Sequence, residues 1–155
     1  MDEFMKIALD EARLGINADH GGPFGAVVVR NDQLVSKAHN EVLKLNDPTA
    51  HAEILAIRRA SSTLNTFDLS DCEIYCTSEP CPMCFSAIYW ARIKKLYYGT
   101  SRNDVSAIGF DDAHIYEIIR GQRKETDQME TLSIDRDGCL EVLREWYAKP
   151  CRKLY

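Results

Sequence analysis

Two short segments of this 155-residue chain carry side chains that can hold and use a metal ion. The first contains His51 and Glu53, and the second contains Cys81 and Cys84 in a Cys-x-x-Cys spacing. One imidazole and two thiolates suit Zn²⁺, and three protein ligands leave a fourth position open for water, as in catalytic zinc sites. The segments therefore predict one Zn²⁺ per chain and hydrolytic chemistry.

Both segments follow signals for the start of a helix. Residues 47–49 combine Asp, Pro and Thr, and residues 78–80 combine Ser, Glu and Pro. One helix is expected to run to about residue 64, and the other from residue 82 to about residue 91. The free amides at a helix N-terminus favour thiolate over thiol, and the i, i+3 spacing puts Cys81 and Cys84 on one face.

Glu53 is expected to act beside the metal and not as a ligand. Two residues along a regular helix would turn it about 200° away from His51. The first turn of a helix is less constrained, so the carboxylate can still lean toward a metal-bound water. Such a group can take a proton from the water and pass it to the substrate as a general acid and base.

A zinc-stabilised interaction domain is the alternative that is not an enzyme. It requires a fourth protein ligand in place of water, which Cys72, Cys76 or His39 would supply. The cysteines outside the Cys-x-x-Cys segment are otherwise expected to be free core or surface residues, because an intracellular chain of this size needs no disulfides.

Composition limits the classes of function. The net charge is −5, from 19 Lys and Arg against 24 Asp and Glu, and basic residues form no extended cluster. Nucleic-acid affinity depends on clustered Lys and Arg, so a nucleic-acid partner is not expected. No apolar run approaches the roughly 20 residues that span a bilayer, and the N-terminus is acidic. We expect a cytoplasmic protein with one domain over residues 1–155.

The hydrophobic pattern predicts alternating helices and strands. A helix is expected over residues 2–16, a hairpin of strands over 24–29 and 33–39, and further strands over 72–77 and 93–99. Beyond them the pattern predicts a helix over 110–120, a last strand over 131–134 and a final helix that ends before Pro150. Together with the two metal-segment helices, this order predicts an α/β fold whose central sheet has helices on both faces.

The chain resembles the cytidine-deaminase-like superfamily of zinc deaminases over nearly its full length. Its signature, H-x-E…P-C-x-x-C, is present as residues 51–53 and 80–84. Within the superfamily the chain looks most like the bacterial guanine deaminases, through residues 21–26, 46–53, 87–92 and 109–112. The resemblance implies a three-layer α/β/α sandwich with a central mixed sheet of five strands.

The resemblance also implies an activity and roles for individual residues. The reaction is hydrolytic deamination of a free purine base, guanine to xanthine and ammonia, by zinc-bound hydroxide. His51, Cys81 and Cys84 would hold the zinc, and Glu53 would shuttle protons. The substrate-binding residues would be Phe24, Asn40, Trp90, Asp112 and Tyr155.

In that family the C-terminal segment crosses to a partner subunit and closes its active site. The resemblance therefore implies a homodimer that exchanges residues 138–155, with Tyr155 reaching the neighbour's substrate. The polar stretch over residues 121–138 has no match in the family beyond its general position.

Two other deaminase activities stay open. A tRNA-specific adenosine deaminase shares both zinc motifs but requires a basic surface for the anticodon stem. A cytosine deaminase shares the zinc core and requires a smaller pocket.

Overall fold

The computed structural model describes residues 2–122 and 129–154, which form two compact units, residues 1–116 and residues 117–155. In chain order, the elements of the first unit are α1 (Glu3–Asn17), β1 (Gly25–Arg30), β2 (Gln33–His39), α2 (Val42–Leu45), α3 (Ala52–Leu64), β3 (Cys72–Ser78), α4 (Pro82–Trp90), β4 (Lys95–Thr100) and α5 (Arg102–Ser106). Helix α6 (Ala113–Ile119) spans the boundary, and α7 (Arg136–Ala148) belongs to the second unit.

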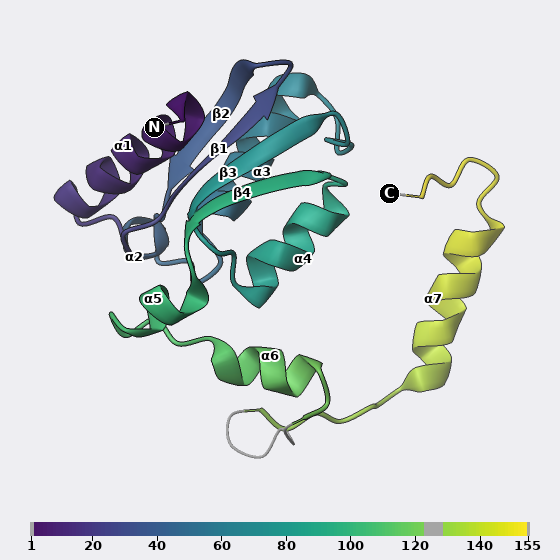
Figure 1. Ribbon diagram of the computed structural model, residues 1–155. Helices are drawn as coiled ribbons and strands as arrows, with labels where there is room; N and C mark the ends of the chain where they lie inside the picture. Colours follow the sequence, from purple (N-terminus) through teal and green to yellow (C-terminus); the bar gives the residue numbers. More distant parts are fainter. Residues whose placement is uncertain (1, 123–128, 155) are drawn as a thin grey trace. The chain divides into compact units, whose positions relative to one another are not determined.

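The sheet of the first unit is mixed and has the strand order β2-β1-β3-β4 (Figure 1). Strand β1 runs antiparallel to β2 and β3, and β3 runs parallel to β4. The predicted fifth strand is wrong, because residues 131–134 form no strand. Their four-residue alternation of polar and apolar side chains is a weak signal, and a strand forms only where a neighbour supplies the other half of the ladder.

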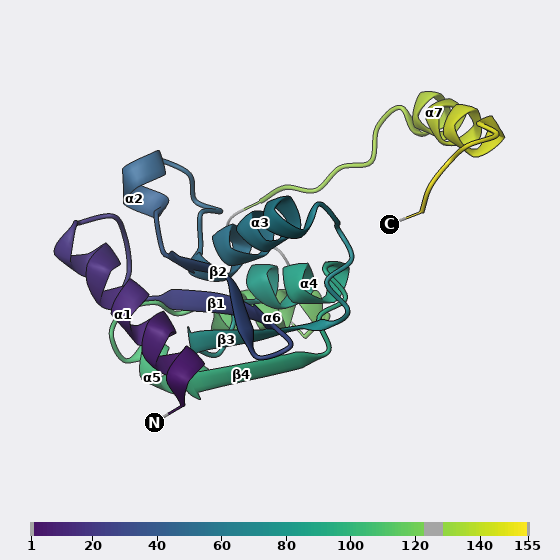
Figure 2. The same ribbon diagram turned by 90° about the horizontal axis from the view of Figure 1, so that it is seen from above.

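The helices of the first unit cover both faces of its sheet, which confirms a three-layer arrangement. On one face, Ala8 of α1 packs against Val27 and Val29 of β1. On the other face, Val28 packs in a core with Leu55 of α3 and further residues of α3 and α4. The alternation along β1 follows from the two-residue period of a strand. Figure 2 shows α3 and α4 next to each other on their side of the sheet.

Gly25 allows α1 to lie directly against the start of β1. A Cβ atom at this position would stand 2.0 Å from the carbonyl oxygen of Ala8. The Gly25 amide donates to Thr77 Oγ1 at 3.1 Å, so the position is fixed from the β3 side as well.

Most predicted bounds agree with the structure, and the exceptions have local causes. Helix α3 begins at Ala52, after residues 47–49, because the Asp47 carboxylate accepts from the amide and hydroxyl of Thr49 and makes a turn of its own. Helices α2 and α5 were not predicted, since elements of four and five residues leave little periodicity to detect. No helix in the described part of the chain has the length and apolar character needed to cross a membrane.

Candidate metal centre and active site

The fold brings the three predicted metal ligands together at the starts of two helices. His51 is the N-cap residue of α3, and Cys81 is the N-cap residue of α4. The Nδ1 atom of His51 lies 3.6 Å from Cys81 Sγ and 3.5 Å from Cys84 Sγ. For Zn–S of about 2.3 Å and Zn–N of about 2.05 Å, a tetrahedral ion separates N and S by about 3.6 Å. The donor types and their spacing therefore fit Zn²⁺.

The structure places the three candidates for a fourth ligand elsewhere. Among the described residues, the cluster holds no His, Cys, Asp or Glu besides His51, Cys81 and Cys84. His39 contacts Glu11 and His20 instead, and the thiol of Cys72 donates to Asp71. A site with three protein ligands keeps a position for water or substrate, as in catalytic zinc centres.

The surroundings of the two thiols favour thiolate at Cys81. A hydrogen bond from the Cys84 thiol lowers the pKa of Cys81 to about 4, with His51 assisting and burial opposing. The same hydrogen bond and burial raise the pKa of Cys84. The hydrogen bond with Cys81 also raises the pKa of His51.

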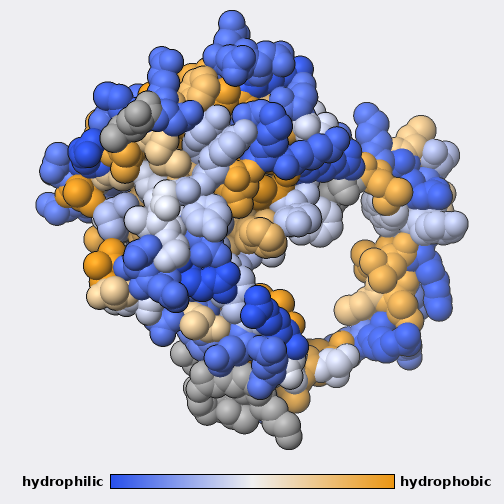
Figure 3. Space-filling view, in the orientation of Figure 1, coloured by the Kyte–Doolittle hydropathy of each residue, from blue (hydrophilic) through white to orange (hydrophobic). Residues whose placement is uncertain are grey.

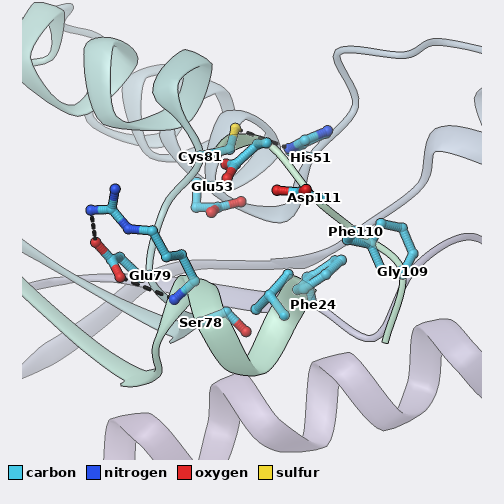
Figure 4. A pocket seen from close by; sticks show the side chains of 12 residues that line it. Phe24, His51, Glu53, Ser78, Glu79, Cys81, Gly109, Phe110 and Asp111 are labelled. Atoms are coloured by element: carbon cyan, nitrogen blue, oxygen red, sulfur yellow. Dashed lines mark hydrogen bonds and ion pairs between the residues drawn. The ribbon is translucent and has the colours of Figure 1, made fainter. Parts of the chain in front are cut away.

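Glu53 lies in the first turn of α3 and faces the metal ligands despite its offset from His51. Its side chain is buried, and burial raises the pKa of the carboxyl group. Figure 4 shows Glu53 grouped with His51 and Cys81. A buried carboxyl group with a raised pKa is suited to exchanging protons near neutral pH.

These groups open into a cavity of about 340 Å³. This volume lies at the lower end of the roughly 300–1,000 Å³ typical of small-molecule pockets. On another side of the cavity, Phe24 and Phe110 meet edge to face, with ring centroids 5.2 Å apart and an interplanar angle of 83° (Figure 4). The lining residues are Phe24, His51, Glu53, Ser78, Glu79, Cys81, Arg102, Val105, Gly109, Phe110, Asp111 and Asp112.

Two neighbouring carboxylates line the cavity, although the sequence pointed only to the second. Asp111 accepts from the amide of Ala113 at 2.9 Å and so supports the start of α6. Burial, followed by the nearby charge of Cys81, raises the pKa of Asp112. Asp112 is therefore the partly desolvated acceptor of the pair.

Asn40 is buried and is not among the residues that line the cavity. Its side-chain oxygen accepts from the amides of Gly22 and Val42, each at 3.2 Å, which fixes the loop after α1 to the start of α2. With the oxygen held in this way, the side-chain amide group is the end that can donate to a ligand.

Trp90, another predicted substrate contact, does not line the cavity either. Trp90 is 67% exposed and lines a separate surface hollow with Phe85, Ser86 and Tyr89. Figure 3 shows hydrophobic side chains gathered over α4 among more polar ones. Tyr155 lies outside the described residues.

Sequence reasoning missed an ion pair in the cavity wall. Arg102 Nη2 lies 2.6 Å from Glu79 Oε1, and the Arg102 amide donates to Glu79 Oε2 at 3.1 Å. The guanidinium group also lies over the ring of Tyr116, 4.4 Å from its centroid. Glu79 had a signal, since it directly precedes Pro80 in the second zinc segment, but nothing in the sequence pairs it with a residue that follows β4.

Comparisons with known proteins agree with this site. Residues 1–100 match the model of the cytidine and deoxycytidylate deaminase zinc-binding region. The guanine deaminase of Bacillus subtilis is 48% identical over 118 residues, which are 76% of each chain. A tRNA-specific adenosine deaminase of Aquifex aeolicus is 47% identical over 95 residues, 61% of this chain and 62% of that one.

Among solved structures, the crystal structure of the Bacillus subtilis guanine deaminase matches with a TM-score of 0.90 and 40% identity. It covers 100% of this chain and 99% of that one. The family model covers the helices and strands that carry His51, Glu53, Cys81 and Cys84. The chain therefore belongs to the cytidine and deoxycytidylate deaminase family and is a zinc-dependent aminohydrolase.

Proposed function

We propose that this protein hydrolyses guanine to xanthine and ammonia in the breakdown of purines. The observation that carries the proposal is the cavity itself, which joins the cluster of His51, Cys81 and Cys84 to an aromatic wall and a carboxylate acceptor. The similarity to the guanine deaminase of Bacillus subtilis supports it, because that similarity extends over the whole chain.

The aromatic wall and the carboxylates suit a flat, donor-rich base. Phe24 and Phe110 offer apolar contact to a purine ring. Asp112 accepts hydrogen bonds, and guanine presents N–H donors that adenine lacks at the same ring positions. The side-chain amide of Asn40 donates toward the purine's acceptor atoms. A site that pairs with a specific donor rejects analogues lacking it by roughly 10⁴-fold or more.

Proton transfer in the reaction is assigned to Glu53. A Zn²⁺ ion, one per chain, would be held by His51, Cys81 and Cys84 and would acidify a water for attack on the amine-bearing carbon. The Glu53 carboxylate takes the proton released from that water and returns it to the adjacent ring nitrogen. A second proton, from the hydroxyl group now on that carbon, passes through Glu53 to the amino group, which leaves as ammonia. One water is therefore consumed for each xanthine formed.

We further propose a homodimer in which residues 138–155 are exchanged and Tyr155 closes the partner's cavity. Two features support this assembly. Helix α7 of the second unit exposes Val142, Leu143 and Tyr147, and α4 of the first unit exposes Tyr89 and Trp90. Exposed apolar side chains gathered on one helix are typical of association surfaces.

Deamination of adenosine in tRNA is the second candidate, since a tRNA-specific adenosine deaminase is 47% identical to this chain over 95 residues. Two observations favour guanine over it. The match to the solved guanine deaminase has a TM-score of 0.90 over 100% of the chain, and the net charge of −5 is unfavourable for a polyanion.

Ammonia release from a panel of substrates tests the proposal. Equal concentrations of guanine, guanosine, adenine, cytosine and a tRNA anticodon stem-loop are incubated with the zinc-loaded enzyme. We expect release from guanine, little from guanosine because its ribose enlarges the ligand, and none from the other three. Release from the stem-loop in preference to guanine would establish the tRNA activity instead.

A further inference from the structure

A second cluster of metal-ligating side chains lies outside the cavity. It comprises His20, which follows α1, His39 at the end of β2 and Glu41 just beyond, and their ligand atoms all lie within 4.8 Å of one another. His20 Nδ1 is 2.8 Å from His39 Nε2, and Glu41 Oε1 is 3.5 Å from the same nitrogen. Two imidazoles and a carboxylate are a frequent donor set for transition metals.

The ring of His39 is held in one orientation by α1. Its Nδ1 lies 3.1 Å from Glu11 Oε2, and the ring packs so closely on Gly15 that a Cβ there would stand 2.8 Å from it. An ionised carboxylate only accepts, so Nδ1 carries the proton and Nε2 presents its lone pair to His20 and Glu41. Metal-binding histidines are oriented by carboxylates in this same way.

The charge of Glu11 supports this tautomer. Burial raises the pKa of its carboxyl group, but hydrogen bonds from Lys37 and His39 outweigh burial and hold the pKa below its usual value. The carboxylate is therefore ionised near neutral pH and orients His39 in the folded protein.

The two histidine nitrogens already lie near the spacing that one bound ion would impose. Nitrogens bound at about 2.05 Å lie about 2.9 Å apart at a right angle and about 3.3 Å apart at the tetrahedral angle. The 2.8 Å between His20 Nδ1 and His39 Nε2 is the length of a hydrogen bond, so His20 Nδ1 carries a proton that a bound ion would displace.

We propose that His20, His39 and Glu41 form a second metal site for a divalent first-row transition ion, with Ni²⁺ as the probe. Glu41 also accepts from Lys44 at 3.1 Å and Arg59 at 3.3 Å. A carboxylate has two oxygens and about four lone-pair positions, so it can bind an ion while it keeps these partners. The two positive charges make this site weaker than the thiolate site.

An ion at this site would fix the loop that holds Asn40. His39 and Glu41 flank Asn40 in the chain, while His20 precedes the glycine whose amide donates to the Asn40 side chain. The His20 carbonyl oxygen already accepts from the amides of Leu43 and Lys44 at 3.0 and 3.1 Å. Bound metal would add a direct link between residues 20–22 and 39–42.

Metal analysis of the zinc-loaded protein tests the site without reference to any substrate. The protein is dialysed against Ni²⁺, and both metals are measured per chain. We expect one Ni²⁺ in addition to one retained Zn²⁺. The midpoint of thermal unfolding should rise with Ni²⁺ concentration, as for any ligand that binds only the folded state. Hydrogen exchange at the Gly22 and Val42 amides should slow.

Variants at three of the four histidines locate the ion. His39→Gln should lose the bound Ni²⁺ and keep its Zn²⁺, and His20→Asn, at a half-buried position that tolerates change, should do the same. His114→Gln is the matched control, because it removes the one histidine outside both clusters, and it should bind Ni²⁺ as the unaltered protein does.

Three results would overturn the second site. They are the absence of a second equivalent, uptake that persists in both His20→Asn and His39→Gln, or uptake of Ni²⁺ only as Zn²⁺ leaves. The last would show that Ni²⁺ had entered the thiolate site.

Discussion

The hydroxyl group of Tyr116 donates to the carbonyl oxygen of Pro80 at 2.9 Å, across 36 positions of sequence. Pro80 precedes the first thiolate ligand, and the Tyr116 ring also lies under the Arg102 guanidinium group. Tyr116 therefore holds the segment that presents Cys81, although it provides no ligand itself.

Replacement of Tyr116 by Phe should loosen that segment while keeping the ring. A neutral hydrogen bond contributes roughly 0.5–1.5 kcal/mol, so we expect Zn²⁺ loss to a chelator to accelerate by up to about tenfold. The rate is measured by mixing with a chromogenic chelator, and Tyr89→Phe, at a position exposed on α4, is the control. Equal rates in the two variants would show that the Tyr116 hydroxyl does not stabilise the site.

Glu53→Gln should separate metal binding from catalysis. The amide keeps the shape of the side chain but cannot take up a proton, and loss of a general acid and base typically costs 10²- to 10⁴-fold in rate. We expect one Zn²⁺ per chain by metal analysis, together with a loss of turnover in that range. A variant without zinc would instead identify Glu53 as necessary for holding the ion.

Asp112→Ala should weaken the use of guanine without affecting zinc. Hydrogen bonds to a charged group contribute roughly 1.5–3 kcal/mol, so kcat/KM should fall by about 10- to 100-fold. Asp111→Ala is the neighbouring control. It should lower kcat/KM less, because it removes only the hydrogen bond that Asp111 accepts from the Ala113 amide. If Asp111→Ala reduces kcat/KM more than Asp112→Ala does, the acceptor has been assigned to the wrong carboxylate.

Removal of residues 152–155 should impair turnover of guanine if Tyr155 closes the partner's cavity. The kinetics are compared with those of Lys153→Ala, which keeps the terminal residue. Unchanged kinetics after truncation would reject a role for Tyr155 as a lid, whereas an equal loss in both proteins would place the effect on Lys153.

Asp68 should make stability depend on pH in the acid range. Hydrogen bonds from Ser70, followed by one from Arg92, lower the pKa of Asp68 from 3.8 to about 2. Because the pKa of Asp68 is lower in the folded protein than in the unfolded chain, the ionised carboxylate stabilises the folded protein above pH 3.8. This contribution is lost as the pH falls from 3.8 toward 2. Zinc-free Asp68→Asn should therefore unfold at lower urea than the zinc-free parent near neutral pH.

The comparison across pH tests the cause of that difference. The gap between the two urea midpoints should shrink below about pH 4 and close near pH 2. A gap that stays constant down to pH 2 would assign the effect to packing or to hydrogen-bond geometry instead of ionisation.

The sequence was sufficient to predict the parts of the site that depend on local structure. His51, Cys81 and Cys84 were predicted as ligands because their types and spacing suit Zn²⁺, and the structure brings them together, two of them at helix caps. The hairpin was found because Asn31 and Asp32 tolerate the positive φ angles of 51° and 57° that its turn requires. In each case the signal lies in short runs of neighbouring residues.

The remaining parts of the site depend on contacts between distant segments. The pairing of Glu79 with Arg102 arises because β3 and β4 run parallel and end side by side, which the composition of either strand does not indicate. Trp90 was predicted at the substrate from the motif, whereas the course of α4 leaves its side chain on the surface. A helix periodicity identifies a face but not what covers it.

The absence of a side chain at position 25 links the packing of α1 to the aromatic wall of the cavity. The backbone of α1 occupies the space that a methyl group would need, and the next residue toward the N-terminus is the aromatic Phe24. Any residue larger than glycine at position 25 would push α1 outward and shift the Phe24 ring with it. Variants at this glycine should therefore lose affinity for the base and stability together, although Gly25 does not itself line the cavity.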